Sequence, residues 1–186
     1  AFVAKKTNPL AKEYSKAGFK LVIENLEKVL DKPKNIKYRK KVMLGGLLSA
    51  VGLMNSGTGP AAAMSYPTGV HYKIPHGIAG AIFLPHIIKH NIKKGFYNYA
   101  KLYQKREIKK ISEEKKSTNF LEEINKKWNK FSIPKNLKKL NMTKKKIKLL
   151  TNQTFELKAA LRQNPVKFQR REILKLFLEL SRVKLK

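Results

Sequence analysis

The residues best suited to chemistry in this chain are its four histidines, His71, His76, His86 and His90, which lie in one stretch of the sequence. An imidazole can bind a transition metal or move a proton near neutral pH. His86 and His90 are four residues apart, a spacing that puts two imidazoles on one helix face and can hold a metal. No Asp or Glu stands near that pair, and a protein metal site needs three or four ligands. We therefore expect the pair to have an ordinary structural role.

A short helix is expected to precede the first two histidines. Residues 57–66 are small and largely apolar, which suits a helix start that packs closely against a neighbour. Pro67 and Gly69 should then break that helix, since both residues are unfavourable in a helix interior. Residues 70–74 are expected to form a short extended link.

A second helix is expected to carry His76. Pro75 suits the beginning of a helix, because the first turn needs no backbone N–H from that position. The run from His76 to Asn91 is apolar on nearly every side, which predicts a buried helix. His76 should therefore lie at the opening turn of a buried helix, where it can face a cleft.

The histidine stretch also carries a longer pattern of small residues, then Pro-x-Gly, then Pro-His-Gly-x-Ala-x-Ala-x-x-Leu-Pro and a later Asn. This pattern resembles the signature of the iron-containing (group III) alcohol dehydrogenases, and the matching positions are Pro67, Gly69, Pro75, His76, Gly77, Ala79, Ala81, Leu84, Pro85 and Asn91. The segments KTNPL and LKAALRQNP resemble Asn-Pro elements of the same family, so the resemblance extends over almost the whole chain. Members of that family have an N-terminal nucleotide-binding domain and a C-terminal all-helical domain, and this chain resembles the second alone.

The resemblance implies a metal site of which this chain holds little. In the family, an Asp and a His four residues apart, together with two later histidines, hold a divalent metal, iron or zinc. The first two would precede Ala1, and the later two correspond to His76 and to position 62, where this chain has Ala62, a residue without a donor atom. A further family histidine corresponds to Tyr66. His71 stands where the family has no habitual histidine.

The activity implied by the resemblance is the NAD(P)-dependent interconversion of an alcohol and an aldehyde or ketone, in which the metal polarises the oxygen and the cofactor carries the hydride. Tyr66 and His71 are expected to line the substrate pocket as catalytic residues, and His76 to be a metal ligand. NAD or NADP would be bound by the domain that this chain lacks, because no glycine-rich phosphate loop follows a strand here. We therefore expect this piece alone to be inactive. Ala62 suggests a reduced or missing metal site, in a metal-poor enzyme acting on a polar or anionic substrate.

The net charge of +30 has two explanations. Lysines and arginines attract nucleic acid or an anionic membrane, but a solvated lysine surface produced by an AT-biased genome would give the same charge. The chain has 36 Lys, 13 Asn and only 6 Arg, whereas recognition of phosphates and base edges favours Arg. The aromatic residues Phe96, Tyr99 and Tyr103 could stack on bases, but their helical spacing favours a core. We therefore expect no nucleic-acid partner, and the placement of the lysines should decide the question.

The remaining composition limits the protein class. No run of eighteen apolar residues is present, so we expect no membrane span. The N-terminus lacks the apolar core of a secretory signal, and the absence of cysteine is compatible with a cytoplasmic protein. Because the chain begins without Met, we expect it to start in mid-protein or after processing.

The fold expected from this pattern is an all-α, multi-helix bundle of roughly seven to nine helices, forming a single C-terminal helical domain over residues 1–186. Asn8 should cap a helix over about 9–30, and a second helix should cover about 36–54, where small residues allow a close helix neighbour. A short helix is expected over 95–103, a charged surface helix end and a loop over 105–119, and a helix over about 119–131. Thr143 should cap another helix, and the last helix should cover about 169–183.

Two functions are compatible with this sequence. The first is the C-terminal part of an alcohol dehydrogenase, with a small-molecule alcohol or carbonyl substrate, a nucleotide-binding half supplied upstream or in trans, and a homo-oligomeric state when intact. The alternative is a catalytically inactive, detached helical domain that acts as a basic binding or structural subunit. An exposed apolar patch near residues 1–3 and 45–50 would support the alternative.

Overall fold

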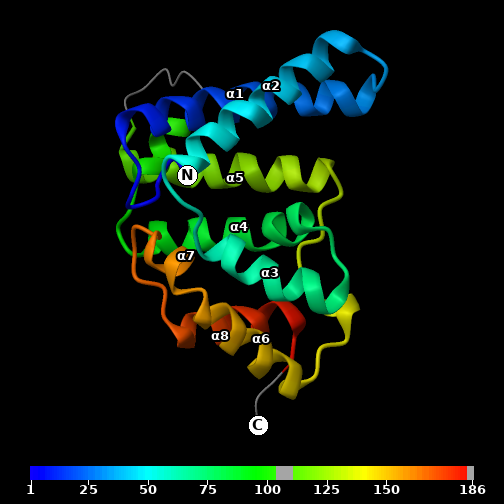
Figure 1. Cartoon of the computed structure of the whole chain (residues 1–186), viewed down its shortest axis with the longest axis vertical. Coiled ribbons are helices and arrows are strands. Elements are labelled where there is room, and N and C mark those ends of the chain that lie inside the picture. The colour runs from blue at the N-terminus through cyan, green and yellow to red at the C-terminus, as the bar shows by residue number, and fades with distance from the viewer. Residues whose placement is uncertain (104–110, 184–186) are drawn as a thin grey trace. The chain divides into compact units, whose positions relative to one another are not determined.

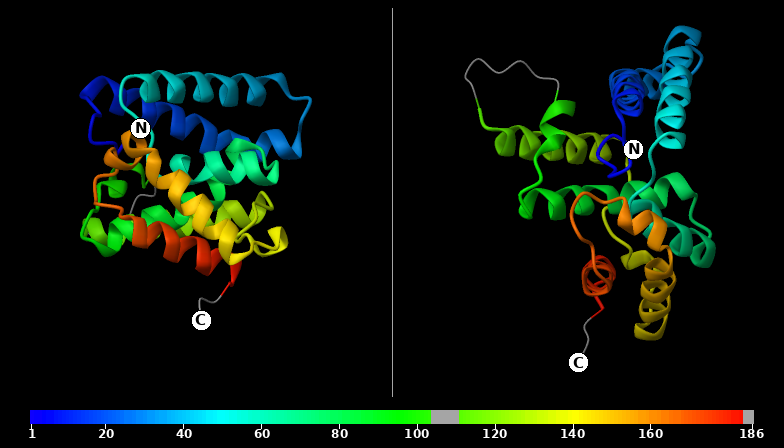
Figure 2. Two further views of the ribbon diagram at one scale, coloured as in Figure 1. Left: turned by 60° about the horizontal axis from the view of Figure 1, so that its bottom comes forward. Right: turned by 60° about the vertical axis from the view of Figure 1, so that its left-hand side comes forward.

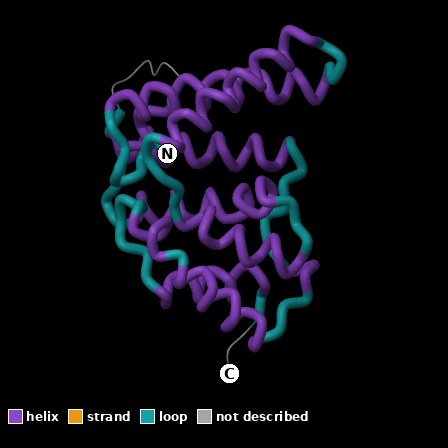
Figure 3. The backbone as a smooth tube through the Cα atoms, viewed as in Figure 1, coloured by secondary structure: helices purple, strands orange, loops and turns teal. Residues whose placement is uncertain are grey.

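The computed structural model describes residues 1–103 and 111–183. These residues form helices and loops without a strand, which confirms the expected all-α class (Figure 1 and Figure 3). The helices are α1 (Pro9–Asp31), α2 (Ile36–Met54), α3 (Pro60–Tyr72), α4 (His76–Lys93), α5 (Glu113–Lys130), α6 (Lys144–Glu156), α7 (Lys158–Arg162) and α8 (Arg170–Ser181), with short 3-10 helices η1 (Asn98–Leu102) and η2 (Lys138–Leu140). The chain divides into two compact units, residues 1–58 and 59–186.

The first unit is a hairpin of the long helices α1 and α2, which lie side by side in both views of Figure 2. Asn8 and Asn35 cap the two helices, and their side-chain oxygens accept the N–H groups of Ala11 and Tyr38. Both helices begin where the sequence predicts them, because these capping residues act locally.

Small residues set the distance between α1 and α2. A Cβ placed on Gly18 would lie 2.6 Å from the Gly45 carbonyl oxygen, and one on Gly52 would lie 2.9 Å from the Ala11 carbonyl oxygen. No side chain fits at such distances, so the backbones approach closely only because glycine stands at these positions. The expected close helix neighbour of α2 is α1.

The second unit is organised around one hydrophobic core. Its largest fully buried side chains include Phe83 of α4 and Phe177 of α8, whose rings meet edge to face with their centroids 5.6 Å apart. Met64 of α3 and Ile147 of α6 belong to the same cluster. The core therefore fixes α3, α4, α6 and α8 relative to one another, and the four histidines lie on α3 and α4.

The predicted break after residue 66 is wrong, because α3 continues through Pro67 and Gly69 to Tyr72. Pro67 and Thr68 are buried, and their packing outweighs the loss of one backbone hydrogen bond. The helix ends instead at Lys73, which has a left-handed φ of 51°. A Cβ at position 69 would lie 3.0 Å from the Ile74 carbonyl oxygen, so glycine there permits a close return of the chain.

The prediction of a helix end and a loop over 105–119 is wrong in its later part. Residues 104–110 lie outside the described residues, but α5 already begins at Glu113. Ser112 caps it by accepting the N–H of Lys115, and two glutamates follow in the first turn, where the helix dipole favours negative charge. The short helix predicted over 95–103 is the 3-10 helix η1. Thr143 caps α6 as predicted, and α8 begins at Arg170, close to the predicted start of the last helix.

Candidate active site

Tyr66 on α3 and His76 at the start of α4 lie together. Their ring centroids are 4.7 Å apart with the planes tilted by 37°. His76 is exposed and Tyr66 is half exposed, so both are open to solvent on the same part of the second unit. The structure therefore brings together two of the three site residues predicted from the sequence.

Ser65 orients the imidazole of His76. The buried Ser65 hydroxyl donates its single hydrogen to the Ala62 carbonyl oxygen, 2.7 Å away. Its oxygen also lies 3.1 Å from His76 Nδ1, and since the hydroxyl proton is already used, Nδ1–H must be the donor in that contact. The neutral ring then presents the lone pair of Nε2. A buried partner that fixes the other ring nitrogen is the usual support of a metal-binding or proton-accepting histidine.

His71 has different neighbours. Lys146 Nζ on α6 donates to His71 Nδ1 at 3.0 Å, and His71 Nε2–H then donates to Gln153 Oε1 at 2.8 Å. Lys146 also lies 6.0 Å from the ring centroid of Tyr72. Both ring nitrogens of His71 are therefore engaged in contacts between α3 and α6, and its role in a substrate pocket stays a prediction.

His86 and His90 lie on α4 beside α8. Burial, followed by the positive charge of Lys89, lowers the pKa of His86, and Glu179 partly offsets this. His90 Nε2 lies 3.4 Å from the Lys167 carbonyl oxygen, and its ring meets Phe168 edge to face at 4.9 Å. Both histidines line a groove between α4 and α8.

The described side chains do not fit a complete metal centre. They contain no group of three or more His, Cys, Asp or Glu that could hold an ion. His76 offers one nitrogen, whereas Ala62, whose carbonyl oxygen is linked to His76 through Ser65, offers no side-chain donor.

The buried side-chain amides of Asn91, near the C-terminal end of α4, and Asn164 bond to each other. Asn91 Nδ2 donates to Asn164 Oδ1 at 3.0 Å and to the Tyr99 hydroxyl oxygen at 2.7 Å, and Asn164 Nδ2 donates to Asn91 Oδ1 at 2.8 Å and to the Val166 carbonyl oxygen at 2.6 Å. Burial raises the pKa of Tyr99 to about 12, although the bond from Asn91 acts in the opposite direction. Both asparagines belong to the segments that carry the family resemblance, but sequence reasoning did not pair them.

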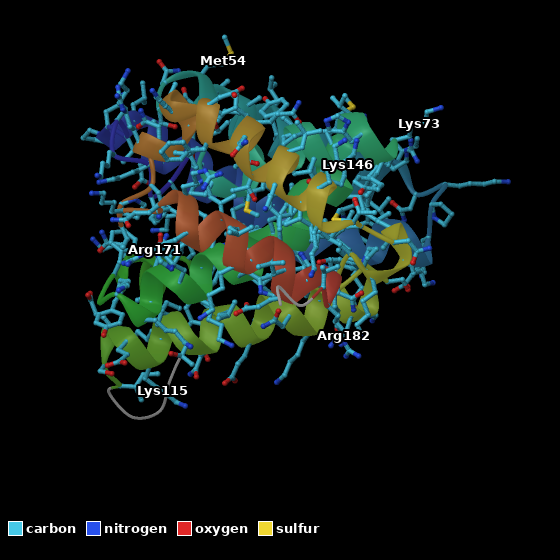
Figure 4. The ribbon with its side chains drawn as sticks, turned by 90° about the horizontal axis from the view of Figure 1, so that it is seen from below. Met54, Lys73, Lys115, Lys146, Arg171 and Arg182 are labelled. Carbon is cyan, nitrogen blue, oxygen red and sulfur yellow. The ribbon has the colours of Figure 1, made fainter. Side chains whose placement is uncertain are left out.

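Exposed lysines are spread along the described helices of both units. Exposed lysines occur on most of the described helices: Lys12 on α1, Lys40 on α2, Lys89 on α4, Lys115 on α5, Lys144 on α6, Lys158 on α7 and Lys175 on α8. Within the second unit, Figure 4 shows Lys115, Lys146 and Arg171 at separate places. None of the described helices is both long and apolar enough to cross a lipid bilayer.

Comparison with known proteins identifies the family. The model of the Fe-containing alcohol dehydrogenase family, C-terminal part, matches residues 1–180. The chain belongs to this family. Among curated relatives of this alcohol dehydrogenase domain, the NADPH-dependent butanol dehydrogenase of Clostridium saccharobutylicum is 27% identical over 184 residues, which are 95% of this chain and 46% of the relative. The 1,3-propanediol dehydrogenase of Citrobacter freundii is 29% identical over 92 residues, which are 50% of this chain and 24% of the relative.

Solved structures agree on the fold of the alcohol dehydrogenase domain. A 1,3-propanediol oxidoreductase has a TM-score of 0.88 at 22% identity, covering 96% of this chain and 47% of that chain. A sulfoacetaldehyde reductase from Bifidobacterium kashiwanohense, solved in complex with NAD+, has a TM-score of 0.84 at 19% identity, covering 98% and 46%. This chain therefore spans about half the length of the full-length relatives to which it is similar.

Proposed function

We propose that this chain is the helical, substrate-side part of an NAD(P)-dependent alcohol dehydrogenase that interconverts an alcohol and an aldehyde or ketone with a reduced or missing metal site. Family membership supports the reaction class, and relatives named NADPH-dependent and NAD-dependent support a nicotinamide cofactor of either kind. The observation that carries the proposal is the oriented pair of Tyr66 and His76 beside a donor-free Ala62.

The proposed chemistry divides between this chain and the nucleotide-binding half. Oxidation of an alcohol releases a hydride and a proton, and the nicotinamide takes the hydride. His76 Nε2, whose lone pair is presented because Ser65 holds Nδ1–H, is available to accept the proton. The Tyr66 hydroxyl lies on the same half-exposed surface and can donate a hydrogen bond to the substrate oxygen. In the reverse direction the protonated imidazole of His76 returns the proton to the substrate oxygen, while the Tyr66 hydroxyl keeps its hydrogen bond to that oxygen.

The test uses the product of the complete reading frame that contains this chain. We expect the protein to oxidise NADH or NADPH when a short-chain aldehyde is present. The reaction is measured as the decrease in absorbance of the reduced nicotinamide. Tyr66→Phe should lower kcat by about 10²-fold, because the substrate oxygen loses a positioned hydrogen-bond donor. Tyr72→Phe is the matched control on the same helix and should leave kcat unchanged. A product that neither binds nor oxidises a reduced nicotinamide with any short-chain aldehyde would overturn the proposal.

A second candidate, the structural or basic binding subunit, is favoured by one face of α2. Met43, Leu47, Ala50 and Met54 are spaced along a single helical stripe, and Met43, Leu47 and Met54 are 77%, 60% and 86% exposed. An apolar stripe of this kind is typical of an interaction surface. Under this candidate, sedimentation should show an assembly that Met43→Lys with Leu47→Lys dissociates, and nicotinamide binding should be absent.

A further inference from the structure

A groove of about 590 Å³ runs between α4 and α8 in the second unit, on residues that the proposed reaction does not use. Its volume is in the range of small-molecule sites. It is lined by His86 and His90 of α4 and by five cations: Lys89 and Lys93 from α4, Lys94 just after α4, and Arg171 and Lys175 from α8.

The groove has more positive than negative charge available to a ligand. Its two carboxylates already have partners: Glu172 accepts the Gln169 N–H at 2.8 Å and lies 3.2 Å from Arg171, and Glu179 lies 3.9 Å from Lys175. Among the described residues, Lys89 and Lys93 have no carboxylate partner. Burial is the main cause of the lowered pKa of His86; Lys89 adds to the lowering, and Glu179 opposes it.

The base of the groove is apolar. Phe168 and Leu176 are buried, with exposed fractions of 6% and 7%, and both line the groove. The ring of His90 is held against Phe168 and is directed by its contact with the Lys167 carbonyl oxygen. A ligand that enters therefore meets an apolar base and a cationic rim.

We propose that this groove binds an organic phosphate, with the phosphate group between the lysines of α4 and the cations of α8 and the apolar body over Phe168 and Leu176. Lysine ammonium groups and an arginine are suitable partners for a phosphate monoester dianion. The inference stands independently of the proposed reaction.

The test is a titration with phenyl phosphate, followed by NMR of the imidazole groups of the purified protein. The chain has four histidines, so two reporters lie in the groove and two, His71 and His76, lie outside it. Saturable shifts should appear for His86 and His90 alone. Phenyl phosphate should bind about fivefold more tightly than inorganic phosphate, because its ring buries apolar surface, and phenol alone should bind weakly.

Matched charge variants separate a site from the general charge of the chain. Lys89→Met with Lys93→Met should weaken phenyl phosphate binding about tenfold. Lys144→Met with Lys145→Met removes the same charge from exposed positions of α6 and should change binding by less than about twofold.

Several results would overturn the proposal. Equal weakening in both double variants, or shifts at all four imidazoles, would show general attraction of anions to a basic protein. Equal affinity for phenyl phosphate and inorganic phosphate would show that the apolar side chains of the groove do not contact the ligand. A titration that does not saturate would show that the groove is not a specific binding site. Tighter competition by an oligonucleotide, increasing with its length, would show that this surface binds nucleic acid instead.

Discussion

The sharpest stability prediction concerns two adjacent glycines of α2. A Cβ on Gly45 would lie 2.9 Å from the Gly18 carbonyl oxygen and 2.9 Å from Leu21 Cβ, whereas a Cβ on Gly46 meets nothing within 4 Å. Carbon atoms pack at about 3.5–4.0 Å, so Gly45→Ala forces the helices apart, at a typical overpacking cost of about 1–3 kcal/mol. Both substitutions gain about 1 kcal/mol of helix propensity. Gly45→Ala should therefore destabilise the hairpin by up to about 2 kcal/mol, and Gly46→Ala should stabilise it by about 1 kcal/mol.

The assay is urea unfolding of both variants, followed by far-ultraviolet circular dichroism. Tryptophan fluorescence is a poor probe here, because the single tryptophan, Trp128, lies in the other compact unit. Because both variants replace glycine by alanine, the difference between their unfolding free energies reports only the contact between α1 and α2 at position 45. Equal shifts of the unfolding midpoint in the same direction would refute the close contact between α1 and α2.

Two further predictions concern the buried polar cluster at the end of α4. Asn164→Ala removes the donor to the buried Asn91 Oδ1, although Asn91 Nδ2 keeps its bond to Tyr99, and should cost about 1–3 kcal/mol of unfolding free energy. Asn152→Ala, on the surface, should stay within about 0.5 kcal/mol in the same urea assay. The pKa of Tyr99, raised to about 12, makes the folded state hold a proton that the unfolded state releases near pH 10, so stability should fall as pH rises from about 10 to 12. Tyr99→Phe should remove that part of the alkaline pH dependence in denaturation curves, and an unchanged slope would contradict the buried phenol.

Local signals were sufficient for much of the fold. The bounds of α1 and α2 follow from caps at Asn8 and Asn35 and from the spacing of small residues, which act over one or two turns. The prediction of a helix break at Pro67 is wrong, because burial of Pro67 in the core outweighs the low helix propensity of proline. The start of α5 was placed too late, although Ser112 followed by two glutamates is a helix-start signal that could have located it.

The candidate site was predicted only in part, because its contacts join distant segments. The resemblance placed His76 and Tyr66 in one cleft, and the structure brings their rings together. The support of His76 by Ser65 crosses a helix junction, and the contact of His71 with Lys146 joins residues 75 positions apart. Neither contact leaves a periodic or motif signal in the sequence, so only the packing of α3 against α4 and α6 reveals them.

The central claim is an alcohol dehydrogenase domain whose metal site lacks a ligand at position 62. Its most direct test is the metal content of the purified full reading-frame product after dialysis against a chelator, measured by mass spectrometry for the natural protein and for Ala62→His. We predict much less than stoichiometric iron or zinc in the natural protein and a clear increase in Ala62→His, because the substitution adds a donor near the imidazole that Ser65 orients. Stoichiometric, chelator-resistant metal in the natural protein, unchanged by Ala62→His, would contradict the claim.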